Sequence, residues 1–120
     1  MGVNSMNWYK IGISVHSLAD RTLLNQQIRA LKDIAGTLSY LSKYVYQNAP
    51  HAKQAVYAIA LDKKISSFPD IKELLLEAHR VALDSYKKFA EFCQVVVGKL
   101  TNHVKLMEVQ RKEFTDDLAT

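Results

Sequence analysis

Residues 24–45 read LNQQIRALKDIAGTLSYLSKYV, and this stretch decides the fold. Its apolar side chains recur at intervals of three, four or seven positions, at Leu24, Ile28, Leu31, Ala35, Leu38 and Val45. That spacing is the period of an α-helix with one face buried. Ile34 and Leu41 broaden the apolar face beyond the narrow seam of a coiled coil. The stretch therefore predicts one helix of a bundle.

The flanks of this stretch indicate where the helix begins and ends. Ser17 can cap the free backbone amides at its start, and Asp20 follows three residues later. Asn48-Ala49-Pro50 should end the helix, because the residue before a proline avoids helical dihedral angles. A second, shorter helix is expected from about residue 51 to residue 65, with small alanines on its apolar side.

A third helix is predicted to begin at Pro69, whose missing amide hydrogen does no harm in a first turn. Its apolar stripe continues through Cys93, Val97, Leu100, Val104, Met107, Phe114 and Leu118. An unbroken helix to Asp117 would be roughly 70 Å long at 1.5 Å per residue, and one domain cannot cover such a rod. Since Gly98 and Asn102 could form a turn, we expect a break or kink between them. The alternative is one continuous helix that is covered by a partner chain.

These patterns predict an all-α fold, a helical bundle of three to four helices in one domain over residues 17–120. A short N-terminal extended or β arm is expected to precede it over residues 1–16. The residues that we expect to find buried in the core are Leu31, Leu38, Leu75, Ala82, Phe89, Val96 and Leu100.

The arm is suggested by residues 8–16, which read WYKIGISVH. Apolar side chains alternate there at Tyr9, Ile11, Ile13 and Val15, the period of a half-buried strand. Helices offer no open edge, so we expect this strand to pair antiparallel with the same segment of a second chain. An extended arm over a hydrophobic groove, or a disordered tail, is the alternative.

Composition limits the class of protein. The 120 residues are 48% hydrophobic and 23% charged, which suits one globular domain. No apolar run approaches the roughly 20 residues of a membrane-spanning helix, so no membrane partner is expected. One cysteine and no signal-peptide pattern predict a cytoplasmic protein. The net charge of +4 is concentrated in residues 1–64, and such a basic half can favour phosphate-rich partners.

No motif for catalysis or ligand binding is recognisable. No two of the four histidines stand at the spacing of a helical metal site, and Cys93 has the apolar neighbours of a core residue. The four glycines are scattered rather than gathered in a phosphate-binding loop. We therefore predict no catalytic residue, no cofactor and no metal ion, and a protein that is not an enzyme.

The most unusual segment is residues 40–57, YLSKYVYQNAPHAKQAVY, which holds four of the six tyrosines and no acidic residue. Its candidate interface or nucleic-acid patch consists of Tyr40, Lys43, Tyr44, Tyr46, His51, Lys53 and Tyr57. Tyrosines can stack on bases while lysines meet phosphates. Tyrosine is equally common in protein interfaces, and these rings could also simply pack between helices.

The function expected from these features is a non-catalytic helical interaction or assembly protein that forms a homo-oligomer, with a dimer favoured, and that can also bind a protein partner. The alternative is a small, basic, helical accessory subunit that binds nucleic acid. The two differ in their response to salt, because phosphate contacts weaken steeply as salt is added.

Overall fold

The computed structural model describes the backbone of residues 13–119 and the side chains of residues 21–113. Within this range the chain forms four α-helices and one 3-10 turn, and it contains no strand. The elements are α2 (Ile13–Tyr44), η1 (Val45–Gln47), α3 (Ala49–Ala60), α4 (Pro69–Val81) and α5 (Tyr86–Ala119). The all-α bundle predicted from the sequence is confirmed.

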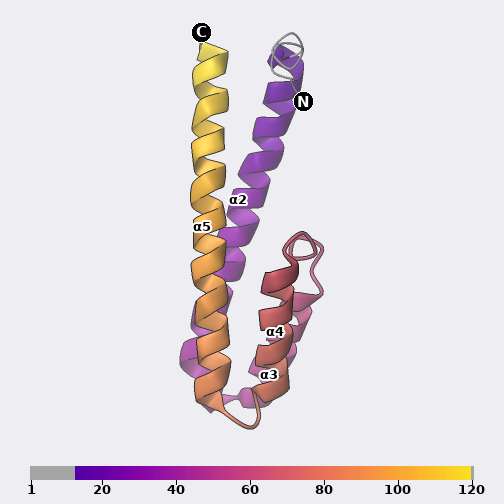
Figure 1. Cartoon of the computed structure of the whole chain (residues 1–120), viewed down its shortest axis with the longest axis vertical. Coiled ribbons are helices and arrows are strands. Elements are labelled where there is room, and N and C mark those ends of the chain that lie inside the picture. The colour runs from indigo at the N-terminus through magenta and orange to yellow at the C-terminus, as the bar shows by residue number, and fades with distance from the viewer. Residues whose placement is uncertain (1–12, 120) are drawn as a thin grey trace.

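The helices differ greatly in length, and this difference shapes the molecule. The long helices α2 and α5 run antiparallel and pack on each other, while the shorter α3 and α4 form a hairpin beside one half of the pair (Figure 1). The molecule is therefore elongated, with extents of 55 × 22 × 17 Å. Toward the chain termini α2 and α5 diverge, and the hairpin does not reach that end (Figure 1).

The core lies where the hairpin meets the long pair. All seven residues predicted to be buried are at most 2% exposed: Leu31, Leu38, Leu75, Ala82, Phe89, Val96 and Leu100. Phe89 is the largest fully buried side chain. The three- and four-residue spacing of apolar positions therefore identified the inward faces of α2, α4 and α5 correctly.

The first helix begins earlier than predicted. Ile13 and Val15, expected in a strand, belong to the first turn of α2, so the strand prediction is wrong over residues 13–16. A helix satisfies its interior backbone hydrogen bonds within one segment, whereas a strand needs a second edge to pair with. Tyr9 and Ile11, the other two residues of the predicted strand, lie outside the described residues.

The second helix occupies residues 49–60 instead of about 51–65. Asn48 does more than end the preceding helix, because its side-chain oxygen accepts a hydrogen bond from the His51 amide at 3.2 Å and so caps α3. Pro50 falls in the first turn of α3, where a missing amide hydrogen costs nothing.

The break in the C-terminal half lies elsewhere than expected. Residues 98–102 continue α5 without interruption, and the chain instead turns between Val81 and Tyr86. The amides of Asp84 and Ser85 both donate to the Val81 carbonyl, at 3.0 and 2.8 Å. The Ser85 hydroxyl then accepts a hydrogen bond from the Lys88 amide at 3.1 Å, which caps α5. The prediction of a break at Gly98–Asn102 is therefore wrong.

Replacing Ser85 by alanine removes this cap and leaves one more amide of the first turn of α5 without a protein partner. We expect the free energy of unfolding to fall by about 1 kcal/mol, the usual value of a serine cap. Urea denaturation followed by circular dichroism measures this change. Ser85→Asp keeps an acceptor at the cap and should stay close to the unchanged protein. Equal stability of Ser85→Ala and Ser85→Asp would contradict a capping role.

Candidate functional site

The four tyrosines of residues 40–57 lie on the surface and not in the core. Their exposed fractions are 58% for Tyr40, 41% for Tyr44, 59% for Tyr46 and 39% for Tyr57. Tyr40 and Tyr44 lie in the last two turns of α2, Tyr46 lies in η1, and Tyr57 lies in the last turn of α3. Tyrosine carries a large apolar ring, so four exposed rings in one short segment leave a large area of aromatic surface available for contact with a partner.

One part of the predicted patch is a ring pair at the end of α2. Tyr40 and Tyr44 are one helical turn apart, and their ring centroids lie 4.8 Å apart at an interplanar angle of 44°. Lys43 is exposed beside them. Tyr46 follows in η1, and its hydroxyl accepts a hydrogen bond from the side-chain amide of Gln47 at 3.4 Å. This arrangement offers two adjoining, tilted tyrosine rings with a positive charge nearby.

The other part of the patch is tied into the seam between α3 and α4. Lys53 donates through Nζ to the backbone carbonyl of His79 at 2.7 Å, and His79 Nδ1 donates to the Lys53 carbonyl at 3.1 Å. The Tyr57 ring lies on the His79 ring, with centroids 4.6 Å apart. Lys53 thereby binds one of the unpaired carbonyls in the last turn of α4.

The structure therefore divides the seven candidate residues. Lys53 and Tyr57 belong to the α3–α4 seam, whereas Tyr40, Lys43 and Tyr44 lie on α2. No hydrogen bond or ring contact joins these two groups within residues 21–113. His51 is exposed in the first turn of α3. His79 was missed by the sequence analysis, because its partner lies 26 residues away and no local pattern marks it.

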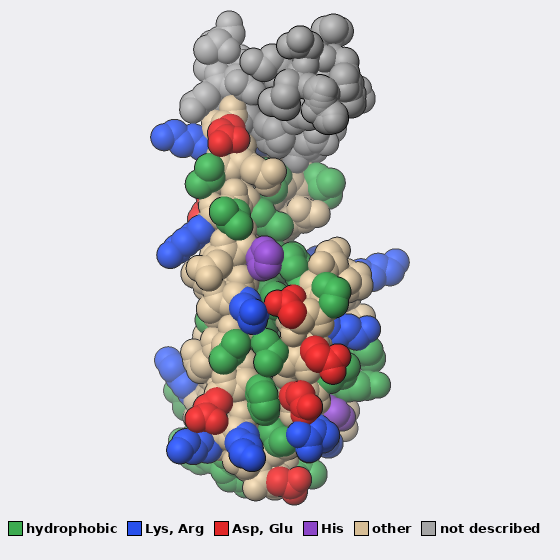
Figure 2. Space-filling model, in the orientation of Figure 1, with side chains coloured by type: hydrophobic (Ala, Val, Ile, Leu, Met, Phe, Trp, Pro, Cys, Tyr) green, Lys and Arg blue, Asp and Glu red, His purple; other side chains and the backbone are tan. Residues whose placement is uncertain are grey.

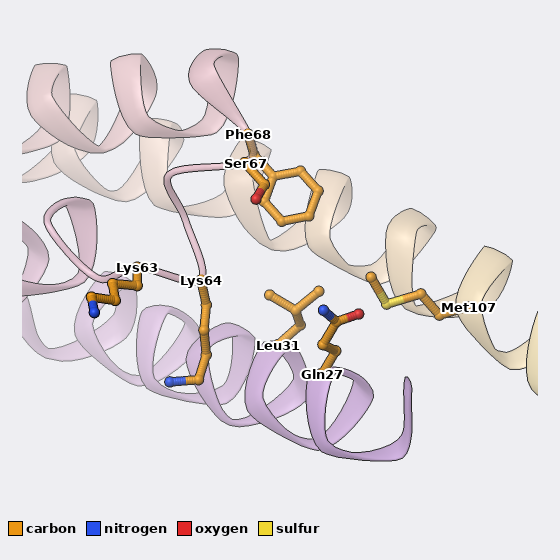
Figure 3. Close-up of a pocket in the computed structure, with 7 residues that line it drawn as sticks. All are labelled: Gln27, Leu31, Lys63, Lys64, Ser67, Phe68 and Met107. Carbon is orange, nitrogen blue, oxygen red and sulfur yellow. The ribbon is translucent and has the colours of Figure 1, made fainter. Parts of the chain in front are cut away.

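A cavity of about 380 Å³ is lined by the loop between α3 and α4 together with the two long helices α2 and α5 (Figure 3). Leu31, Phe68 and Met107 converge on its centre, from α2, the loop and α5 respectively (Figure 3). The Phe68 ring also packs on His103 of α5, with centroids 4.5 Å apart. The cavity exists because the hairpin ends here and no side chain fills the space between the diverging helices.

The chemistry of this cavity is mainly apolar. Gln27 and Ser67 contribute polar groups to its wall, and Lys63 and Lys64 lie at its edge. The amino groups of both lysines point away from the Phe68 ring (Figure 3). The Lys64 ammonium lies 3.7 Å from the Asp62 carboxylate, which compensates its charge. Such a cavity can hold a small apolar group, but it brings no nucleophile and base together.

A second cavity, of about 440 Å³, lies on the seam between α2 and α5 and is bordered by Arg29, Lys32 and Arg111. Glu108 of α5 lies 3.2 Å from the Lys32 ammonium and 3.7 Å from the Arg111 guanidinium. The Arg111 guanidinium also donates to the Asn25 side chain at 3.2 Å. These contacts join the two long helices near the level of the α3–α4 loop, so the charges help to hold α2 and α5 together at this point.

Cys93 is fully buried, as predicted, and burial raises the pKa of its thiol to about 12. The thiol therefore stays protonated at neutral pH and cannot act as a nucleophile in the folded protein. We expect a thiol reagent such as Ellman's reagent to label the native protein far more slowly than the denatured protein. Rapid labelling of the native protein at neutral pH would contradict this burial.

None of the described helices is long and apolar enough to cross a membrane. No group of three or more histidine, cysteine, aspartate or glutamate side chains is placed to hold a metal ion in that part of the chain. No known protein family matches the chain, and neither a characterised protein nor a solved structure is significantly similar to it.

Proposed function

We propose that the protein is a non-catalytic assembly protein that forms homo-oligomers and binds protein surfaces through its exposed apolar side chains. The observation that carries this proposal is the number and grouping of those side chains. Eleven large hydrophobic residues are exposed in the described part of the chain: Leu23, Tyr40, Tyr44, Tyr46, Tyr57, Leu61, Leu83, Tyr86, Val95, Leu106 and Val109.

Single exposed apolar residues are normal, but grouped ones mark interaction sites. Tyr40 and Tyr44 lie at the end of α2 and Tyr46 follows in η1. Val95, Leu106 and Val109 share one face of α5. Hydrophobic side chains exposed on the column formed by α5 are visible in Figure 2. We also propose a cytoplasmic location, since the single cysteine is buried and unpaired, as in proteins of reducing compartments.

The mass of the protein in solution at low and high salt tests the proposed function. We expect an oligomer whose mass is the same at both salt concentrations, because burial of apolar surface is not weakened by salt. A monomer at every protein concentration would contradict homo-oligomer formation. An assembly that dissociates in high salt and carries nucleic acid would contradict the apolar basis of the interaction.

Binding of nucleic acid is the second candidate function, and the absence of acidic residues from Ile34 to Leu61 supports it. Lys43 and the ring pair of Tyr40 and Tyr44 could bind a single strand by stacking and charge. Lys53, however, is engaged with the His79 carbonyl. Retention on single-stranded RNA at low salt, lost on Lys43→Glu substitution, is the result that would favour this candidate.

A further inference from the structure

The two long helices meet along a seam that faces away from the α3–α4 hairpin. Lys99 of α5 is held 3.3 Å from the Asp70 carboxylate of α4, which marks the hairpin side of α5. Gln94 lies five residues earlier, about 140° around the helix from Lys99. Three side-chain contacts between α2 and α5 define the seam: Asn25 with Arg111, Lys32 with Glu108, and Ser42 with Gln94.

Exposed lysines border this seam on both helices, and we call the surface that they form the basic face. Basic side chains project along the edge of the long helices that lies away from the hairpin (Figure 2). The lysines of each helix lie within about 20° of one another around its axis. The basic face consists of Lys32 and Lys43 on α2 and of Lys87, Lys105 and Lys112 on α5, all exposed.

The two helices contribute to one continuous surface. Lys32 and Lys105 border the same cavity, of about 280 Å³, although they come from different helices. Lys87 and Lys112 lie 25 residues apart, which is roughly 38 Å along α5. That length is close to one turn of a DNA double helix.

Few acidic side chains interrupt the basic face. Glu108 is the one acid between its lysines, and Lys32 at 3.2 Å and Arg111 at 3.7 Å compensate its charge. Asp33 and Glu91 lie at the outer edges, about 80° and 40° around their helices from the nearest lysine of the face.

The other acidic residues of the described side chains lie elsewhere. Four belong to α4 or to the loop before it, one to the turn before α5, and one lies about 80° beyond Lys105 around α5: Asp62, Asp70, Glu73, Glu77, Asp84 and Glu113. Together with Arg29 at its edge and Arg111 in the seam, the basic face carries seven cations against three acids, counting Asp33 and Glu91.

The surface between the lysines is polar and formed by small side chains. Ala35, Gly36, Ser39 and Thr101 lie there. Of the exposed large hydrophobic residues, only two approach its edges, Tyr40 and Val109. A helix that binds a membrane surface needs a row of large apolar side chains, and a single-strand site needs rings for base stacking. The middle of the basic face offers neither.

We infer that the basic face binds the phosphate backbone of a nucleic acid double helix. A double helix keeps its bases stacked inside and presents one negative charge per about 1.7 Å of its axis. Lysines bind such phosphates without reading the sequence. This inference goes beyond the proposed function, because apolar assembly does not use this face. It also differs from the second candidate, in which the exposed tyrosines bind a single strand.

Fluorescence anisotropy with a labelled DNA duplex of about two helical turns tests the inference on the full, nuclease-treated chain. We expect a plot of log affinity against log salt concentration to fall with a slope of about −4 to −5, the value for five phosphate contacts. Lys87→Glu combined with Lys105→Glu should raise the Kd at least tenfold and make the slope shallower by about 2. Both lysines are exposed, so circular dichroism should show unchanged helix content.

Lys88→Glu combined with Lys63→Glu is the matched control, because it changes the net charge equally. Lys88 is adjacent to Lys87 in sequence but lies about 100° away around α5, and Lys63 lies in the α3–α4 loop; both are exposed. We expect this control to raise the Kd less than about threefold, since charges more than about 10 Å apart are largely screened at 0.1 M salt.

Four results would overturn the inference. Equal weakening by the two double variants would show that binding follows net charge and not this face. Tighter binding of the single strand than of the duplex would favour the tyrosine site instead. Binding to vesicles of anionic phospholipid but not to the duplex would identify a membrane as the partner. No binding of the duplex at low salt would exclude the partner outright. None of these results alters the mass of the protein in solution, which tests the proposed function separately.

Discussion

Leu38→Asp is expected to leave most of the chain unfolded under conditions in which the unchanged protein is folded. Leu38 is 0% exposed, at the centre of the contact between α2 and its neighbours. A carboxylate there would be buried without a partner, and such groups cost several kcal/mol. Domains of this size are stable by only about 5–15 kcal/mol in total. Far-ultraviolet circular dichroism should show a large loss of helix.

The matched control is Thr37→Asp, which places the same carboxylate one residue earlier on the exposed side of α2. This variant should retain its helix content and unfold within a few degrees of the unchanged protein. Leu31→Asp should be milder than Leu38→Asp, because Leu31 borders the 380 Å³ cavity and a carboxylate there can reach water. A folded Leu38→Asp protein would show that the α2 side of the core is packed differently.

Phe89→Ala is expected to lower the free energy of unfolding by about 3–5 kcal/mol, the usual cost of removing a fully buried aromatic ring. Phe89 is 0% exposed in the first turn of α5 and is the largest fully buried side chain of the described residues. Its removal leaves a cavity that the surrounding helices can fill only in part. Urea denaturation measures the change from the midpoint and slope of the transition.

Tyr86→Ala is a suitable control for Phe89→Ala, because Tyr86 is an aromatic residue of the same helical turn but is 47% exposed. We expect this variant to lose no more than about 1 kcal/mol, as surface substitutions usually do. If both variants lost the same stability, the effect would come from the start of the helix and not from the buried ring.

The sequence by itself determined the helices and their inward faces. The three- and four-residue spacing in residues 24–45 is a local property of the chain, and it is preserved because each apolar face must be buried. The same spacing correctly identified Leu75, Phe89 and Val96 as core residues. Burial of Cys93 followed in the same way from its apolar neighbours.

Helix boundaries were harder to derive, because competing local signals differ little in energy. The helical spacing of apolar residues in 93–107 continues across Gly98. The helix is unbroken there, although Gly98 and Asn102 are residues that favour turns. Ser85 and Asn48 each cap a helix with one side-chain hydrogen bond, worth about 1 kcal/mol, and such single residues are difficult to distinguish from ordinary polar positions. Residues 13–16 alternate like a strand but join α2, since a helix needs no second edge.

Only the tertiary structure decided the contacts between residues distant in sequence. Lys53 meets His79 across 26 residues, and Phe68 meets His103 from another helix. The exposure of Tyr40 and Tyr46, and the open space at Gly98, likewise follow from how the helices pack on one another. The spacing of residues along a helix specifies which face is buried, but the lengths and crossing of the other helices determine which surfaces remain uncovered and available to a partner.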